Sequence, residues 1–243
     1  MVRFALLMTA VAALPLAWGV TRAAVGVVVR LCMCSGSLLS AEIIALTVGF
    51  VGVLVLLLVL PKPMRLYVFE HELTHAIWGV LFGERVESFK VSPYGGSVTF
   101  KARRKPRGWM WLDIWMTLAP YFFPLYTVLV ILAALITRCF VSPLPGTLLW
   151  LAAVSGTWCF HVYFTIESLL RRQSDIEAYG RVFSYVFIWI INVMEVALAV
   201  VCTTEITWRQ WTHLNVYHTE QAYHAVKVFF VWLYELVCTL PFL

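Results

Sequence analysis

Two histidines and a glutamate stand at the spacing with which proteins bind one zinc ion. His71-Glu72-Leu73-Thr74-His75 is an HExxH motif. Residues four apart on a helix project from nearly the same face, so both imidazoles reach one ion while Glu72 reaches the water bound to it. Zinc lowers the pKa of that water toward ~7, and a glutamate removes its proton as general base. The motif therefore predicts a zinc hydrolase with His71 and His75 as ligands.

A catalytic zinc ion also needs a third protein ligand and an open position for water. The acidic and imidazole side chains that remain as candidate donors are Asp113, Glu167, Asp175, Glu177 and His161. From the helical rise, His75 and His161 are both expected about 13 Å from the membrane surface at which their helices end. Asp175 lies close to the cytoplasmic end of the last predicted helix, 182–202, and a modest extension of that helix brings it toward the zinc. Depth thus favours Asp175, with His161 as the second candidate.

The helix that carries the motif belongs to a chain of membrane-protein composition. Hydrophobic residues make up 62% of the 243 residues and charged residues 13%. Soluble proteins average roughly 45–50% and about 25%. Too little polar surface remains for a soluble enzyme, a disordered chain or a nucleic-acid-binding protein. The six cysteines are scattered, which is typical of small apolar residues and not of a disulfide framework.

Apolar stretches long enough to cross about 30 Å of hydrocarbon predict an all-α polytopic membrane protein with about six transmembrane helices. The predicted helices cover residues 4–20, 43–60, 64–82, 114–137, 147–170 and 182–202. The third helix contains Glu70, His71, Glu72 and His75. Such residues cost several kcal/mol in lipid unless they are paired, bound to metal or open to a water-filled cavity. An HExxH motif in a membrane helix therefore indicates a functional site more strongly than the same motif in a soluble protein would.

The segment 83–108 differs from its apolar surroundings. It holds seven Lys or Arg against Glu84 and Glu87, so the positive-inside rule places it on the cytoplasmic side. Alternating apolar residues flank Pro93-Tyr94-Gly95-Gly96 and predict a membrane-associated β-hairpin after the motif helix. The residues expected to face a substrate strand are Phe89, Val91, Gly95, Gly96, Val98 and Phe100. The alternative is a plain cytoplasmic loop whose basic end binds anionic headgroups.

At these residues the sequence resembles a known family. HELTHA, GERVESFKVSPYGGSVTF, LAPYFFP and QSDIEAYG occur in that order. Together they resemble the site-2 protease family of intramembrane zinc metalloproteases, over about half of the chain. The resemblance implies that His71, His75 and Asp175 bind zinc, that Glu72 is the general base and that the hairpin dips toward the site.

Two departures from the family pattern stand out. Asp175 lies in Gln173-Ser174-Asp175-Ile176, whereas the family usually has an LDG sequence. Neither Asn192 nor Asn215 is placed to act as the asparagine with which the family holds the substrate carbonyl. His161 is expected at the depth of His75, so it is a candidate for that transition-state or water contact.

The predicted activity is zinc-dependent hydrolysis of peptide bonds in or near the transmembrane segments of membrane proteins. The expected partners are a transmembrane protein substrate and the lipid bilayer, with a regulatory membrane partner or a second copy also compatible. A small chain without appended soluble domains favours a bacterial inner membrane. Residues 1–40 are interpreted as a transmembrane or signal-like segment, 41–202 as the protease core and 203–243 as a tail with an interfacial aromatic helix.

Two alternatives remain open at this stage. A CAAX-type membrane zinc protease also places HExxH in a membrane helix and would take a glutamate, Glu167 or Glu177, as its third ligand. A non-catalytic membrane scaffold that retains a metal site is the second alternative.

Overall fold

The structure, a computed structural model, describes residues 2–34, 41–101, 109–141, 145–203 and 207–239. It divides into two compact units, one of residues 38–178 and one of residues 1–37 together with 179–243. These two units are defined by how densely their residues pack together. The division into residues 1–40, 41–202 and 203–243, which the sequence predicted on functional grounds, stays a prediction.

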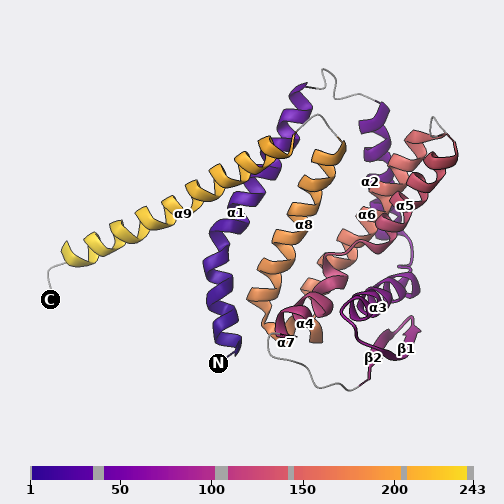
Figure 1. Cartoon of the computed structure of the whole chain (residues 1–243), viewed down its shortest axis with the longest axis horizontal. Helices are drawn as coiled ribbons and strands as arrows, with labels where there is room; N and C mark the ends of the chain where they lie inside the picture. The colour runs from indigo at the N-terminus through magenta and orange to yellow at the C-terminus, as the bar shows by residue number, and fades with distance from the viewer. Residues whose placement is uncertain (1, 35–40, 102–108, 142–144, 204–206, 240–243) are drawn as a thin grey trace. The chain divides into compact units, whose positions relative to one another are not determined.

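The unit 38–178 contains the HExxH motif and is mainly helical (Figure 1). Its elements are α2 (Ala41–Val59), α3 (Met64–Leu81), β1 (Val86–Ser92), β2 (Gly95–Phe100), α4 (Trp109–Leu118), the 3-10 turn η1 (Ala119–Tyr121), α5 (Leu125–Phe140), α6 (Thr147–Leu170) and most of α7 (Ser174–Tyr179). The motif lies on α3, and Asp175 lies on α7.

Small residues allow α2 and α6 to pack closely along much of their length. A Cβ atom on Gly49 would lie 2.1 Å from the carbonyl oxygen of Ala152, and one on Gly156 would lie 2.9 Å from Cγ2 of Val53. Close backbone approach at small residues is the usual way in which membrane helices pack, because lipid provides little hydrophobic drive. This packing fixes α6, whose far end contributes residues to the site described below.

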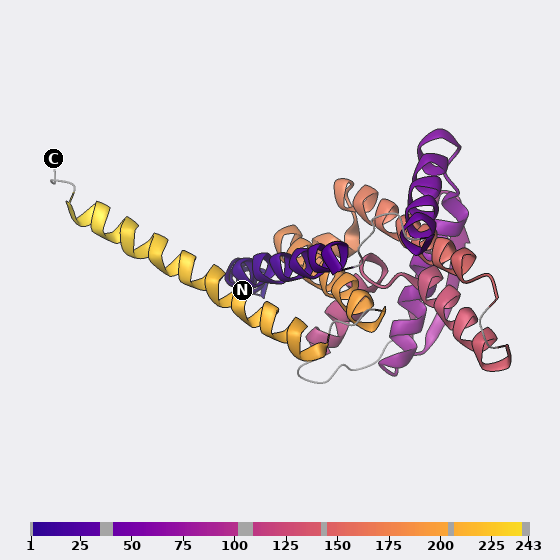
Figure 2. The same cartoon turned by 90° about the horizontal axis from the view of Figure 1, so that it is seen from above.

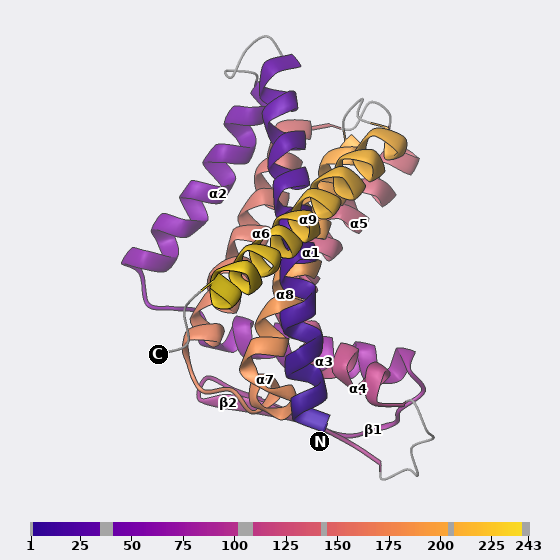
Figure 3. The ribbon, with the colours of Figure 1, turned by 90° about the vertical axis from the view of Figure 1, so that its left-hand side faces the viewer.

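The β-hairpin follows directly from the end of α3. Gly83 has a positive φ of 82°, and its N–H donates to Val80 while the N–H of Glu84 donates to Gly79. This pattern is a Schellman helix end, which favours glycine at the left-handed position. The chain then forms β1 and β2, paired antiparallel from Val86 with Phe100 to Ser92 with Gly95. The predicted hairpin is confirmed, and it lies against α3 (Figure 3).

Among the residues that the structure describes, four helical segments are long and apolar enough to cross a membrane, or five if a bent pair counts as one span. The four are Val2–Val27, Ala41–Val59, Thr147–Leu170 and Arg181–Leu198. They indicate an integral membrane protein, and the predicted count of about six is not confirmed. The helix α3 is not among them, since Arg65, Glu70 and Glu72 make it too polar for that assignment.

The predicted single helix over 114–137 is broken in the structure. Trp109–Tyr121 and Leu125–Phe140 meet at an angle of 81°. Pro120 and Pro124 lie at the break, and each removes a backbone N–H that a continuous helix would use. The break brings η1 against α3 and so positions Tyr121 next to the motif.

The second unit consists of α1 (Val2–Cys34), α8 (Arg181–Thr203) and α9 (Trp208–Thr239). Both α8 and α9 pack on α1. The indole N–H of Trp189 on α8 donates to the hydroxyl of Thr21 at 3.0 Å, and the hydroxyl of Tyr223 on α9 donates to the carbonyl of Ala12 at 2.9 Å. The C-terminal half of α9 extends beyond α1 (Figure 2).

Candidate metal centre

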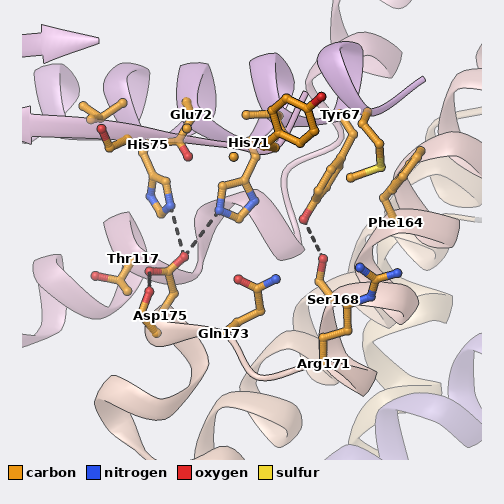
Figure 4. A pocket seen from close by; sticks show the side chains of 18 of the residues that line it. Tyr67, His71, Glu72, His75, Thr117, Phe164, Ser168, Arg171, Gln173 and Asp175 are labelled. Carbon is orange, nitrogen blue, oxygen red and sulfur yellow. Dashed lines mark hydrogen bonds and ion pairs between the residues drawn. The ribbon is translucent and has the colours of Figure 1, made fainter. Parts of the chain in front are cut away.

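Three side chains from two distant parts of the sequence converge in the unit 38–178. His71, His75 and Asp175 each offer a ligand atom, and these atoms lie within 4.8 Å of one another. Nε2 of His71 is 3.4 Å and Nε2 of His75 is 3.3 Å from Oδ2 of Asp175 (Figure 4). One turn of α3 supplies the two imidazoles, and the N-terminal end of α7 supplies the carboxylate. The arrangement has the residue types and proximity of a metal site.

The environment of His75 is suited to a cation on Nε2. Nδ1 of His75 lies 3.0 Å from the carbonyl oxygen of Met116, while Nε2 faces Asp175. A neutral imidazole has one N–H, so it can satisfy only one of these two oxygen acceptors. When Nδ1–H donates to Met116, the lone pair of Nε2 faces a carboxylate. A metal ion between Nε2 and the carboxylate resolves this conflict, and the Met116 contact is the outer bond that metal-bound histidines usually make.

Most contacts of the Asp175 carboxylate fall on Oδ2, while the hydroxyl of Ser174 donates to Oδ1 at 3.3 Å. Oδ2 is approached by both imidazoles and also accepts a hydrogen bond of 3.2 Å from the hydroxyl of Tyr121. Burial opposes ionisation of Asp175, but the interactions of its carboxylate with the imidazoles of His71 and His75 outweigh it and hold the pKa of the carboxyl well below its usual range. Asp175 is therefore an anion, as a metal ligand must be.

Glu72 lies beside the triad and in contact with the hairpin. Its side chain is buried, and its carboxylate accepts a hydrogen bond from the backbone of Val98 in β2. A Cβ atom on Gly96 would lie 2.5 Å from Cγ of Glu72. Glycine at this position therefore allows β2 to pack directly on the residue that the sequence predicts as the general base.

A cavity of about 560 Å³ opens in front of the triad. His71, Glu72, His75 and Asp175 line one part of it, and β2 lines another. Tyr67 and Phe164, stacked with ring centroids 4.5 Å apart, form an apolar wall. Polar residues also line the cavity, namely Ser168 near the end of α6, and Arg171 and Gln173 between α6 and α7 (Figure 4). A volume of this size is typical of ligand sites.

No family model, curated protein or solved structure matches this chain.

His161, predicted near the zinc, lies elsewhere in the same unit. It is buried, and its Nδ1 is 3.9 Å from Oε1 of Glu70, which does not line the cavity. His161 is not among the residues that line the cavity. An equal distance from the ends of two helices predicted His161 near the zinc, but its imidazole is directed to Glu70.

The two glutamates considered as third ligands are engaged with cations. Glu167 lines the cavity, yet Lys62 Nζ lies 2.8 Å from its Oε1 and Arg171 pairs with the same oxygen. The hydrogen bond to Glu167 raises the pKa of Lys62. Glu177 lies 3.7 Å from Arg172. Neither belongs to the ligand cluster that the structure brings together, and Asp113 does not line the cavity.

The hairpin residues divide between the two strands. Gly95, Gly96, Val98 and Phe100 of β2 line the cavity, whereas Phe89 and Val91 of β1 do not. Phe89 packs edge-on against Phe69 of α3. The expectation that both strands face a substrate is therefore corrected, because β2 occupies the position next to the cavity and β1 lies behind it.

Sequence reasoning did not assign the outer contacts of the site. Tyr121 lies in LAPYFFP, which supported the family resemblance without giving this tyrosine a role. Met116 contributes a backbone carbonyl, and the sequence does not indicate which carbonyl will contact a histidine. Tyr67 was also missed, although its hydroxyl lies 2.5 Å from that of Ser168 and so joins α3 to α6 beside the cavity. For Tyr67 and Tyr121 the sequence did offer a signal, because a tyrosine buried in an apolar segment needs a hydrogen-bond partner.

Proposed function

We propose that the chain is an intramembrane zinc metalloendopeptidase of the site-2 protease type. The observation that carries this proposal is the meeting of His71, His75 and Asp175 at the wall of a cavity that Glu72 and β2 also line. The HExxH order favours zinc among the ions that such ligands accept. The finer topology belongs to the same proposal, with α3 inside the membrane as one of about six helices.

The ligands would be Nε2 of His71, Nε2 of His75 and the carboxylate of Asp175. When bound, zinc supplies a Lewis acid and lowers the pKa of a water molecule. Glu72 accepts the proton of the attacking water and returns it to the amine that leaves. Because Glu72 is buried between α3 and β2, its carboxylate is held in one orientation for this transfer. Met116 and Tyr121 orient His75 and Asp175 from outside the ligand set.

The substrate would be a transmembrane segment that unwinds before cleavage. An intact helix keeps its carbonyls in its own hydrogen bonds, so the scissile bond must first become extended. The strand β2 lines the cavity and, within the described residues, pairs only with β1, so its other edge would take an extended segment by strand addition. The stacked rings of Tyr67 and Phe164 would receive an apolar side chain of that segment.

The expected setting is a bacterial inner membrane, with the segment 83–108 on the cytoplasmic side. The basic part of this segment, 102–108, lies outside the described residues. The topology rests on its excess of Lys and Arg.

Substitution of the proposed base tests the activity. The full chain with Glu72→Gln, reconstituted with a single-span substrate, should bind zinc as the wild type does and lose cleavage by at least about 10³-fold, since general-base catalysis and water orientation are both lost. Glu87→Gln is the matched control, because Glu87 is exposed on β1 and should cleave normally. Cleavage at the wild-type rate by Glu72→Gln would refute the proposal.

One observation keeps the CAAX-type alternative in view, namely that Glu167 lines the cavity. In a protease of that type Glu167→Ala or Glu177→Ala should lose zinc while Asp175→Ala keeps it. Our proposal expects the reverse. A variant set that binds zinc stoichiometrically but shows no cleavage of any single-span substrate would instead favour the non-catalytic scaffold.

A further inference from the structure

A second cavity lies in the unit formed by α1, α8 and α9, and it has no part in the proposed proteolysis. It has a volume of about 750 Å³ and runs between α1 and α9. Its position is set by a close crossing of the two helices. A Cβ atom on Gly19 would lie 2.6 Å from Cα of Thr219, so the backbones touch there. The groove extends from this crossing along both helices.

One end of the groove is cationic. Arg22 of α1 and His218 of α9 both line it. Arg22 lies within a segment apolar enough to span a membrane, and within the described residues it makes no ion pair and no side-chain hydrogen bond. Partial burial and the positive charge of Arg22 lower the pKa of His218. Glu220, the acid nearest in sequence to His218, is exposed and does not line the groove. The charge of Arg22 is thus left for an anion from outside the chain.

The other end of the groove is apolar. Leu14, Val11 and Val226 line it, with Ala222 and Ala225 leaving space between the helices. Trp18 lies between the two ends and is 60% exposed, so a large aromatic face is open to an occupant. An occupant that matches the whole groove needs an anionic head and a hydrocarbon body.

The length and depth of the groove agree with one membrane leaflet. Arg22 lies five residues before the end of the candidate span Val2–Val27, about 8 Å along the helix, where arginine side chains reach the interface. Eleven residues separate Arg22 from Val11, which is about 16 Å of helix. Half of a hydrocarbon core of about 30 Å is about 15 Å.

We propose that the groove between α1 and α9 binds an anionic phospholipid, with the phosphate at Arg22 and His218 and an acyl chain along Leu14, Val11 and Val226. The phosphate accepts hydrogen bonds from the guanidinium and the imidazole N–H, and Trp18 covers the glycerol region. The lipid fills the space beside the helix crossing and holds α9 against α1. This inference does not depend on the zinc site, which lies in the other unit.

Lipid binding to the purified full chain in neutral detergent tests the proposal. Native mass spectrometry with phosphatidylglycerol and with phosphatidylcholine of the same acyl chains should show tighter binding of the anionic lipid. Arg22→Gln should weaken that binding by about tenfold, the effect of losing charged hydrogen bonds to phosphate. Arg3→Gln removes the same charge from an exposed position on the same helix and should bind as the wild type does.

A second variant and a second ligand keep the result unambiguous. Ala225→Trp fills the apolar end without changing a charge, and it should weaken phosphatidylglycerol binding while the thermal unfolding of the detergent-purified chain stays cooperative. Equal affinity for the two lipids, wild-type binding by Arg22→Gln, or displacement of the lipid by millimolar inorganic phosphate alone would each overturn the proposal. The last result would assign the cationic end to a free phosphate.

Discussion

Nδ1 of His75 lies 3.0 Å from the carbonyl oxygen of Met116, and this contact connects the HExxH helix to α4. The bond leaves Nε2 of His75 as the lone-pair donor facing Asp175. Because the acceptor is the backbone carbonyl of Met116, a substitution of the Met116 side chain would not remove it. The orientation of the ligand therefore depends on the position of α4, which the break near Pro120 sets.

The hydroxyl of Tyr121 should matter for metal affinity. Tyr121→Phe removes the hydrogen bond to Oδ2 of Asp175 and leaves the ring in place. Loss of an outer-shell bond to a ligand typically lowers metal affinity 10- to 100-fold, so we expect about a tenfold weaker zinc complex in competition with a chelator. Tyr126→Phe is the matched control, because its hydroxyl donates to Leu66 and does not contact the triad. Equal loss in both variants would contradict a specific role for Tyr121.

Gly96 should be essential for the placement of the hairpin. In Gly96→Ala the new Cβ would lie 2.5 Å from Cγ of Glu72 and 2.7 Å from the carbonyl oxygen of Lys90, so β2 must shift. Overpacking of this kind costs about 1–3 kcal/mol. We expect kcat/KM for a single-span substrate to fall by about tenfold or more, with zinc content unchanged. Gly52→Ala has open space around the new methyl group and should behave as the wild type. Normal cleavage by Gly96→Ala would show that β2 does not position the substrate or Glu72.

His161 should contribute to stability and not to turnover. His161→Ala removes the imidazole that lies 3.9 Å from the buried Glu70 carboxylate, and removing the partner of a buried polar group costs about 1–3 kcal/mol. The double variant Glu70→Gln with His161→Ala should be more stable than His161→Ala, as thermal unfolding in detergent would show. Below the unfolding temperature the folded His161→Ala protein should cleave at the wild-type rate. Loss of turnover in a folded His161→Ala protein would restore the predicted contact with the transition state.

The sequence was sufficient for the elements that carry short-range signals. The i, i+4 spacing of His71 and His75, the glycine-rich turn near Gly95 and the long apolar helices each depend on neighbouring residues, and the structure contains all three. Asp175 was also singled out, although the sequence alone left other donors open. The helical rise gives the expected depth of each residue in the membrane, and only residues at similar depths can bind the same ion.

Depth does not specify which face of a helix points where, and this is where sequence reasoning was insufficient. His161 and His75 were matched in height, yet His161 faces Glu70 because the packing of α6 on α2 fixes its rotation. The break between α4 and α5 and the division of the hairpin into a cavity-lining strand and an outer strand are likewise decided by tertiary contacts. Tyr121 acquires its role only through that break.

Metal analysis of the purified full chain tests the central claim most directly. We predict about one zinc ion per chain, with zinc lost in His71→Ala, His75→Ala and Asp175→Ala, since a catalytic site has three protein ligands. His213→Ala, which changes an exposed histidine on α9, should retain the metal. A wild-type protein that binds no zinc under metal-replete conditions, or a His71→Ala with His75→Ala double variant that keeps it, would contradict the account.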